Sequence, residues 1–93
     1  MALPDITLQM AATLDRLLAD GWELPIHFAL VSVNGSVIGG LYERQDDGRI
    51  RPSLTTAPRG RFLLPINMML VNRGTGAAVR VVFEHGAEPK FIQ

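Results

Sequence analysis

The sequence contains no cysteine, no excess charge of either sign and no long apolar run. Without cysteine the chain can form no disulfide, no thiolate nucleophile and no cysteine-based zinc site. Nine Lys and Arg residues balance nine Asp and Glu residues, so the basic excess typical of nucleic-acid binders is absent. The two most apolar stretches, 24–33 and 62–71, are about half as long as a membrane-spanning helix. They are more consistent with buried strands.

The first five residues do not show the pattern of a secretory signal. Residues 1–5 carry no positive charge and lead into no long apolar segment, so we expect no secretory signal. We expect a cytoplasmic protein. A length of 93 residues with 47% apolar content fits one folded domain over 1–93 and is too short for two separate cores.

A helix is predicted from Asp5 to Asp20, because apolar residues recur there at spacings of three and four. Asp5 is suited to the N-cap or to the first turn, and Gly21 to the position just after the helix. Thr13 is expected on the polar surface. The buried stripe would consist of Ile6, Met10, Leu14, Leu17 and Leu18.

Asn34-Gly35 lies between two segments with a period of two, 26–33 and 36–43, and predicts a hairpin with a two-residue type I′ turn. That turn would place His27 opposite Tyr42 and Ala29 opposite Gly40. Both faces of the hairpin would then be apolar, whereas a helix can cover only one. One face would carry Phe28, Leu30, Val37 and Leu41, and the other Ala29, Val31, Val33 and Ile38.

The rest of the chain predicts more strands. A weak strand over 49–56 is interrupted by Pro52, and a second hairpin joins 66–72 to 77–84 through Arg73-Gly74-Thr75-Gly76. We find no internal repeat and predict a flexible C-terminal tail over 86–93. The fold class is therefore α+β, with an N-terminal helix on a four- to five-stranded antiparallel sheet. The same pattern is compatible with a sheet that curls toward a small barrel.

Catalytic signatures are missing from the sequence. His27 and His85 are far apart and have no metal-ligand spacing. No nucleophile elbow, Walker loop or zinc-protease helix occurs. We therefore predict a protein that is not an enzyme and that has no metal and no cofactor.

Charge is unevenly distributed along the chain. Residues 1–47 carry a net charge of −5 and residues 48–93 a net charge of +5, and eight of the nine cations are arginine. These charges can neutralise one another within the fold or across a contact between copies. An arginine bias is also typical of a GC-rich genome, and we expect a bacterial source. Arginine favours bidentate contacts to phosphate and carboxylate, so an anionic-ligand site is the alternative, at Arg49, Arg51, Arg59, Arg61 and Arg73.

Two short motifs resemble those of Sm-like RNA-binding proteins. After an N-terminal helix and a strand, Asn34-Gly35 is followed by Ile38, Gly40 and Asp46, and Arg73-Gly74 lies between two late strands. The resemblance implies a small barrel that binds RNA or another anionic ligand. It covers about a third of the chain. Tyr42 stands where these proteins have Leu, and the Asn of their uridine pocket is absent.

Our main functional prediction is an interaction domain whose apolar sheet face meets a second copy or another protein. The simplest assembly is a two-fold homodimer. The methionines of the second hairpin would add adaptable side chains. The interface would consist of Val31, Val33, Ile38, Met68 and Met69.

Overall fold

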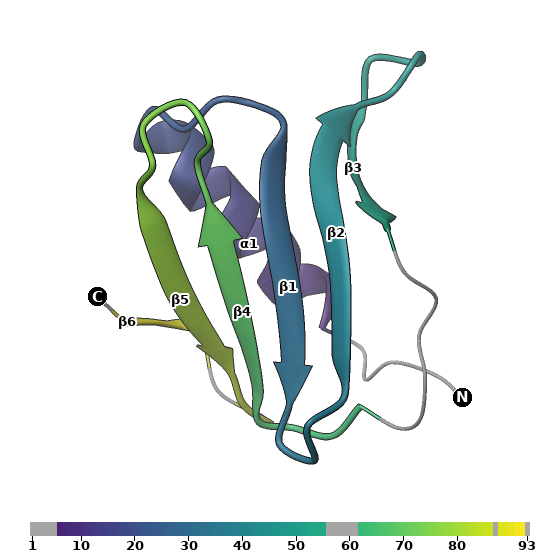
Figure 1. Cartoon of the computed structure of the whole chain (residues 1–93), viewed down its shortest axis with the longest axis vertical. Coiled ribbons are helices and arrows are strands. Elements are labelled where there is room, and N and C mark those ends of the chain that lie inside the picture. The colour runs from purple at the N-terminus through teal and green to yellow at the C-terminus, as the bar shows by residue number, and fades with distance from the viewer. Residues whose placement is uncertain (1–5, 56–61, 87, 93) are drawn as a thin grey trace.

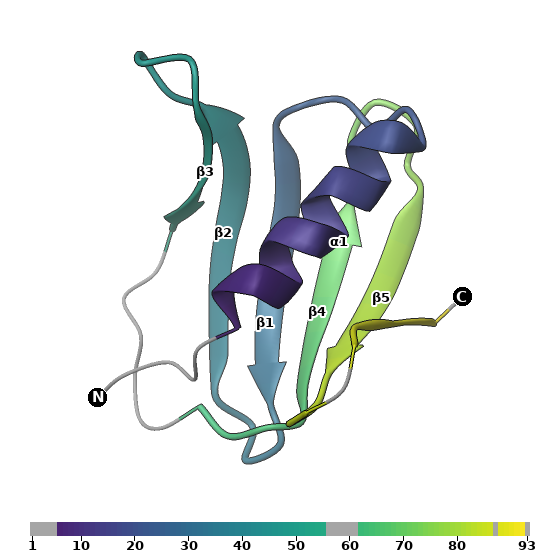
Figure 2. The same ribbon diagram turned by 180° about the vertical axis from the view of Figure 1, so that it is seen from behind.

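One helix packs diagonally across one face of a six-stranded antiparallel sheet (Figures 1 and 2). The structure is a computed structural model and describes residues 6–55, 62–86 and 88–92. The strand order is β3-β2-β1-β4-β5-β6. The elements are α1 (Thr7–Ala19), β1 (Ile26–Ser32), β2 (Val37–Arg44), β3 (Ile50–Leu54), β4 (Ile66–Val71), β5 (Ala78–Phe83) and β6 (Lys90–Ile92).

The predicted α+β class is confirmed, with two corrections to the sheet. Over the described residues it has six strands instead of four or five, and it stays open, with β3 at one edge and β6 at the other. The barrel alternative is therefore wrong. The segment predicted as a tail, 86–93, contains β6, which pairs with β5. Three residues next to Pro89 are too few to show the alternation that indicates a strand.

The helix ends in a Schellman motif, as its glycine suggests. Gly21 has a φ of +94°, which a residue with a side chain rarely adopts. Its N–H donates to the Leu18 carbonyl, and the Trp22 N–H donates to the Leu17 carbonyl at 3.0 Å. Asp5, the predicted N-cap, lies outside the described residues. The predicted stripe faces the sheet: Ile6, Leu14 and Leu17 are buried, and Met10 and Leu18 are partly buried.

Thr13 was wrongly predicted on the polar surface. It is fully buried, and its hydroxyl donates to the Gln9 carbonyl one turn earlier at 2.8 Å. This bond satisfies the hydroxyl within the helix, so a threonine can occupy a position in the buried stripe.

The first hairpin has a register one residue away from the prediction. Ser32 pairs with Ser36 around a three-residue loop, and only Gly35 in that loop has positive φ, at 88°. A type I′ turn needs positive φ at two residues, whereas a three-residue loop needs it at one. Tyr42 consequently lies opposite Ile26 instead of His27.

The register change moves β2 side chains to the other face. Ala29 lies opposite Gly39, not Gly40, and Leu30 lies opposite Ile38. Ile38 therefore faces the helix, while Val37 and Leu41 face away from it. Both faces of the hairpin remain apolar, but their members differ from the prediction.

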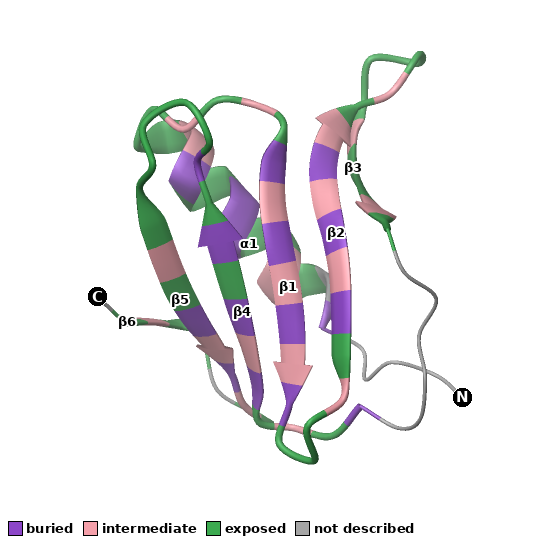
Figure 3. Cartoon of the chain, in the orientation of Figure 1, coloured by how far each residue is buried: buried purple, intermediate pink, exposed green. Residues whose placement is uncertain are grey.

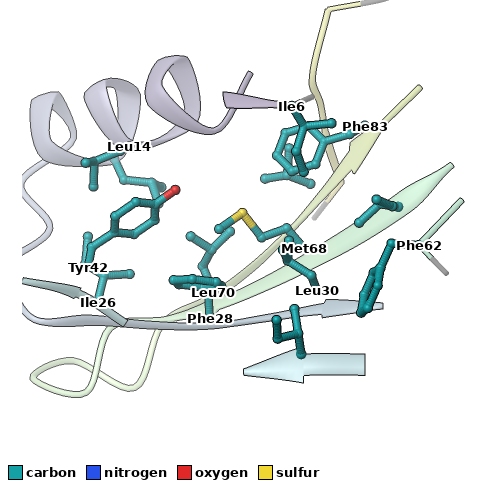
Figure 4. Packing of buried hydrophobic residues seen from close by; sticks show 14 residues of the cluster. Ile6, Leu14, Ile26, Phe28, Leu30, Tyr42, Phe62, Met68, Leu70 and Phe83 are labelled. Carbon is teal, nitrogen blue, oxygen red and sulfur yellow. The ribbon is translucent and has the colours of Figure 1, made fainter. Parts of the chain in front are cut away.

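The core lies between α1 and the near face of the sheet (Figure 4). Phe28 packs against Tyr42, with ring centroids 5.1 Å apart, and lies over Gly40, its cross-strand partner. The Tyr42 hydroxyl approaches the Met10 carbonyl at 3.5 Å and ties the sheet to the helix. Burial raises the pKa of Tyr42 above its usual range, so this side chain stays neutral at physiological pH.

The two halves of the sheet are related by approximate two-fold symmetry, which corrects the expectation of no internal repeat. Leu24-Pro25-Ile26 and Leu30-Val31 recur as Leu64-Pro65-Ile66 and Leu70-Val71. The repeated strands β1 and β4 pair antiparallel at the centre of the sheet, and each is followed by two more strands outward. The approximate axis passes between Ala29 and Met69, which are directly opposite each other.

Ser32 fixes the connection that crosses from β3 to β4. Its hydroxyl donates to the Leu63 carbonyl at 3.0 Å and accepts from the Leu63 N–H at 2.7 Å. The serine is buried, whereas Leu63 is 42% exposed, so the two bonds attach a surface segment to the end of β1.

We expect Ser32→Ala to lower the free energy of unfolding by about 1–3 kcal/mol, because two backbone groups of Leu63 lose the partner that fixes them to the sheet. Urea denaturation would measure it. Ser36→Ala, four residues along in the exposed turn region, is the matched control and should change stability by less than about 0.5 kcal/mol. Equal effects of the two changes would contradict this role of Ser32.

Candidate functional site

The face of the sheet turned away from α1 is the candidate site, and we call it the open face. In Figure 3 it is the face toward the viewer, and no other described element lies over it. In a strand, successive side chains point to opposite faces, so burial alternates along β1. The apolar side chains of the open face are Ala29, Val31, Val37, Leu41, Met69, Val71, Ala78, Val82 and Ile92.

Polar residues lie among these side chains, since Asn67 separates Val31 from Val82 and Arg80 separates Met69 from Ile92. Several of the apolar side chains are accessible. Val37 is 57% exposed, Met69 41% and Val71 40%. Val31 lies between Val37 on one side and Asn67 on the other, and it is half-buried by its neighbours. An apolar surface that spans four strands is typical of an interaction site.

The structure brings together only part of the predicted interface. Val31 and Met69 lie on the open face, and Val33 is in the β1–β2 turn, 62% exposed. Placing Ile38 and Met68 on this face was wrong, because both are fully buried on the helix side. Ile38 changed faces with the register. Met68 and Met69 are consecutive strand residues, so they cannot share a face.

Sequence reasoning missed the other large apolar members of the open face, which are Val37, Leu41, Val71, Val82 and Ile92. The alternation in 77–84 and the hairpin register were the available signals. Neither says which face the helix covers. The helix covers the face that carries Phe28, Leu30 and the other large core residues, because α1 packs against those side chains.

His27 and Arg73 lie at the end of the open face where β1 begins. The Arg73 guanidinium comes within 3.5 Å of His27 Nε2, and His27 is directly opposite both Leu41 and Val71. Polar groups thus border the apolar surface at this end, as in many protein interfaces.

The predicted arginine site is largely neutralised where the structure describes it. Arg51 forms a salt bridge of 2.9 Å with Asp47, whose other oxygen accepts from the Arg49 N–H. Asp46 and Glu43 add negative charge to the same hairpin, so its three arginines and three acids balance.

The remaining predicted arginines do not join this hairpin. Arg73 is in the β4–β5 turn, at the same end of the sheet but separated from the β2–β3 hairpin by β1 (Figure 1). Arg59 and Arg61 lie outside the described residues.

A small apolar cavity opens between α1 and the edge of the sheet. Its volume is about 240 Å³, below the usual range for small-molecule sites. The nearest polar group is the Tyr42 hydroxyl, which points to the Met10 carbonyl. The lining offers no convergent polar groups that would orient a substrate. It consists of Met10, Ala11, Leu14, Tyr42, Ile50 and Pro52.

The histidines lie at opposite ends of the sheet, His27 where β1 begins and His85 just after β5 ends. Within 6–55, 62–86 and 88–92, no three His, Asp or Glu side chains come close enough to hold a metal ion. Ser32, one of the few candidate nucleophiles, is engaged with Leu63. In the same ranges, no helix combines the length and the apolar character needed to cross a membrane.

Comparisons with protein-family models, with curated proteins and with solved structures found no match to this chain.

Proposed function

We propose that the chain is a non-enzymatic interaction domain that self-associates through its open face. The observation that carries the proposal is the apolar surface over β2, β1, β4 and β5, on the side of the sheet opposite α1. Exposed apolar surface of this extent favours association, because burying it removes apolar area from water. The proposal keeps the cytoplasmic setting expected from the sequence.

The size of the open face suits a second copy of the chain. Six strands at about 4.8 Å and six residues at about 3.3 Å span roughly 29 by 20 Å, or about 580 Å² when taken as flat. Side chains raise the accessible area of such a surface toward the about 800 Å² per partner that stable complexes bury. A two-fold dimer is self-complementary and needs no other component.

RNA or another anionic ligand is the competing prediction, and the described arginines give it less support. The β2–β3 hairpin has no net charge, and Arg51 is already paired with Asp47. Phosphate contacts weaken steeply with salt, whereas apolar association does not. Measuring self-association and binding to single-stranded RNA at two salt concentrations would separate the two functions.

We expect Val31→Glu to raise the dissociation constant of the dimer about 100-fold while the chain stays folded, because the carboxylate would be buried on association without a partner. Sedimentation would measure the constant and circular dichroism the fold. The matched control is Leu8→Glu, since Leu8 is 82% exposed on α1 and should leave association unchanged. An unchanged constant for Val31→Glu would exclude the open face. Ile38→Glu would be uninformative, because Ile38 belongs to the core.

A further inference from the structure

The middle row of the open face runs from small residues to large ones. Five side-by-side residues from β2, β1, β4, β5 and β6 form this row: Gly39, Ala29, Met69, Arg80 and Ile92. The β2 and β1 positions carry at most a methyl group, whereas the β4, β5 and β6 positions carry long side chains. The half of the row on β2 and β1 is therefore a shallow trough, bordered by the Thr55 side chain beside Gly39. The other half is a ridge, with a hollow lined by Met69, Arg80 and Ile92.

The approximate symmetry of the sheet is broken at this row. The two-fold axis relates Ala29 to Met69 and Gly39 to Arg80, whereas Val31 is related to Val71, an identical residue. A face with equal halves would allow a second copy to dock in two orientations equally well. The difference in side-chain size between the two halves makes the two docking orientations unequal.

Two aligned sheets that pack face to face can be related by a two-fold axis along the strands or across them. An axis across the strands places Met69 against Met69 of the second copy, and Arg80 against Arg80. Like charges then meet, and the two Ala29 residues leave a gap. An axis along the strands places Ala29 against Met69 and Gly39 against Arg80, so that each ridge fills a trough.

We infer that the dimer axis runs along the strands between β1 and β4, so that β1 packs on β4 of the second copy and β2 on its β5. This inference rests on the proposed self-association. Arg80 lies one strand from the β6 edge, where its guanidinium can remain in water while its methylenes cover Gly39.

Engineered disulfides test this arrangement cleanly because the chain has no cysteine. Ala29→Cys and Met69→Cys would be made as separate proteins, since the two residues are cross-strand neighbours within one chain. Cysteines that face each other across two packed sheets can form a disulfide. We expect the mixture of the two variants to cross-link, under mild oxidation, at least tenfold faster than either variant alone.

Arg80→Cys is the third variant and the control for orientation. With an axis along the strands, the two Arg80 positions lie three strand spacings apart, about 14 Å sideways, so this variant should not cross-link. Rapid cross-linking of Arg80→Cys, or faster cross-linking of Met69→Cys alone than of the mixture, would overturn the inferred axis and leave the dimer intact. A dimeric mass without cross-linking at any of the three sites would place the interface elsewhere. A monomeric mass would refute the proposed function itself, and the axis with it.

Discussion

Phe28→Ala is expected to lower the free energy of unfolding by about 3–5 kcal/mol, the usual range for removing a buried aromatic ring. Phe28 is 5% exposed in the core. Its ring packs on Tyr42 and fills the space above Gly40. Since small domains are stable by about 5–15 kcal/mol, the variant should be close to unfolding at 37 °C.

Thermal and urea denaturation at equal protein concentrations would measure this effect, because association makes apparent stability depend on concentration. Phe28→Leu is the matched control. It keeps an apolar side chain of smaller volume and should cost about 1–1.5 kcal/mol. A loss below about 1 kcal/mol for Phe28→Ala would mean that the core is wrongly placed.

Gly40→Val is the second change with a large expected effect, about 3 kcal/mol or more, because the site has no room for a side chain. A Cβ at Gly40 would come within 2.5 Å of Phe28 Cζ and 2.7 Å of the Ser53 carbonyl oxygen. The ring and the backbone of β3 cannot both withdraw without breaking the β2–β3 pairing. The loss would be measured by the same urea denaturation.

The adjacent Gly39 gives a control on the opposite face of the same strand. A Cβ there would meet only the end of the Thr55 side chain, at 3.0 Å, which can rotate away. Gly39→Val should therefore cost less than about 1 kcal/mol in the monomer, because β-branched residues suit strands. If the two substitutions destabilised the chain equally, the tight packing of Phe28 over Gly40 would not be the cause.

The sequence predicted the helix, the α+β class and the positions of β1 to β5, because these follow from local periodicity, but it did not predict β6. It did not predict the hairpin register. Asn34-Gly35 favours a two-residue turn, but with a single positive φ at Gly35 the chain forms a three-residue loop. A shift of one residue exchanges the faces of a strand, which is why Ile38 was assigned to the wrong side.

An uncovered apolar face of the sheet was predicted from the sequence, but only some of the residues that form it were. Two apolar faces and one covering helix imply an uncovered face, and both faces of the hairpin are still apolar in the observed register. Which residues form the face depends on the alternation of side chains along each strand, and a shift of one position reverses it. Met68 and Met69 are adjacent, yet Met68 lies in the core and Met69 on the open face. The approximate symmetry between 24–31 and 64–71 was present as Leu-Pro-Ile and Leu-Val in both segments, but its meaning requires the pairing of β1 with β4.

The mass of the wild-type chain in solution tests the central claim most directly. Sedimentation equilibrium from low to high micromolar concentration, repeated at low and high salt, would be the measurement. The proposed open-face dimer predicts twice the chain mass of 10.2 kDa at high micromolar concentration, with little dependence on salt. A mass of 10.2 kDa at every concentration would contradict self-association through the open face.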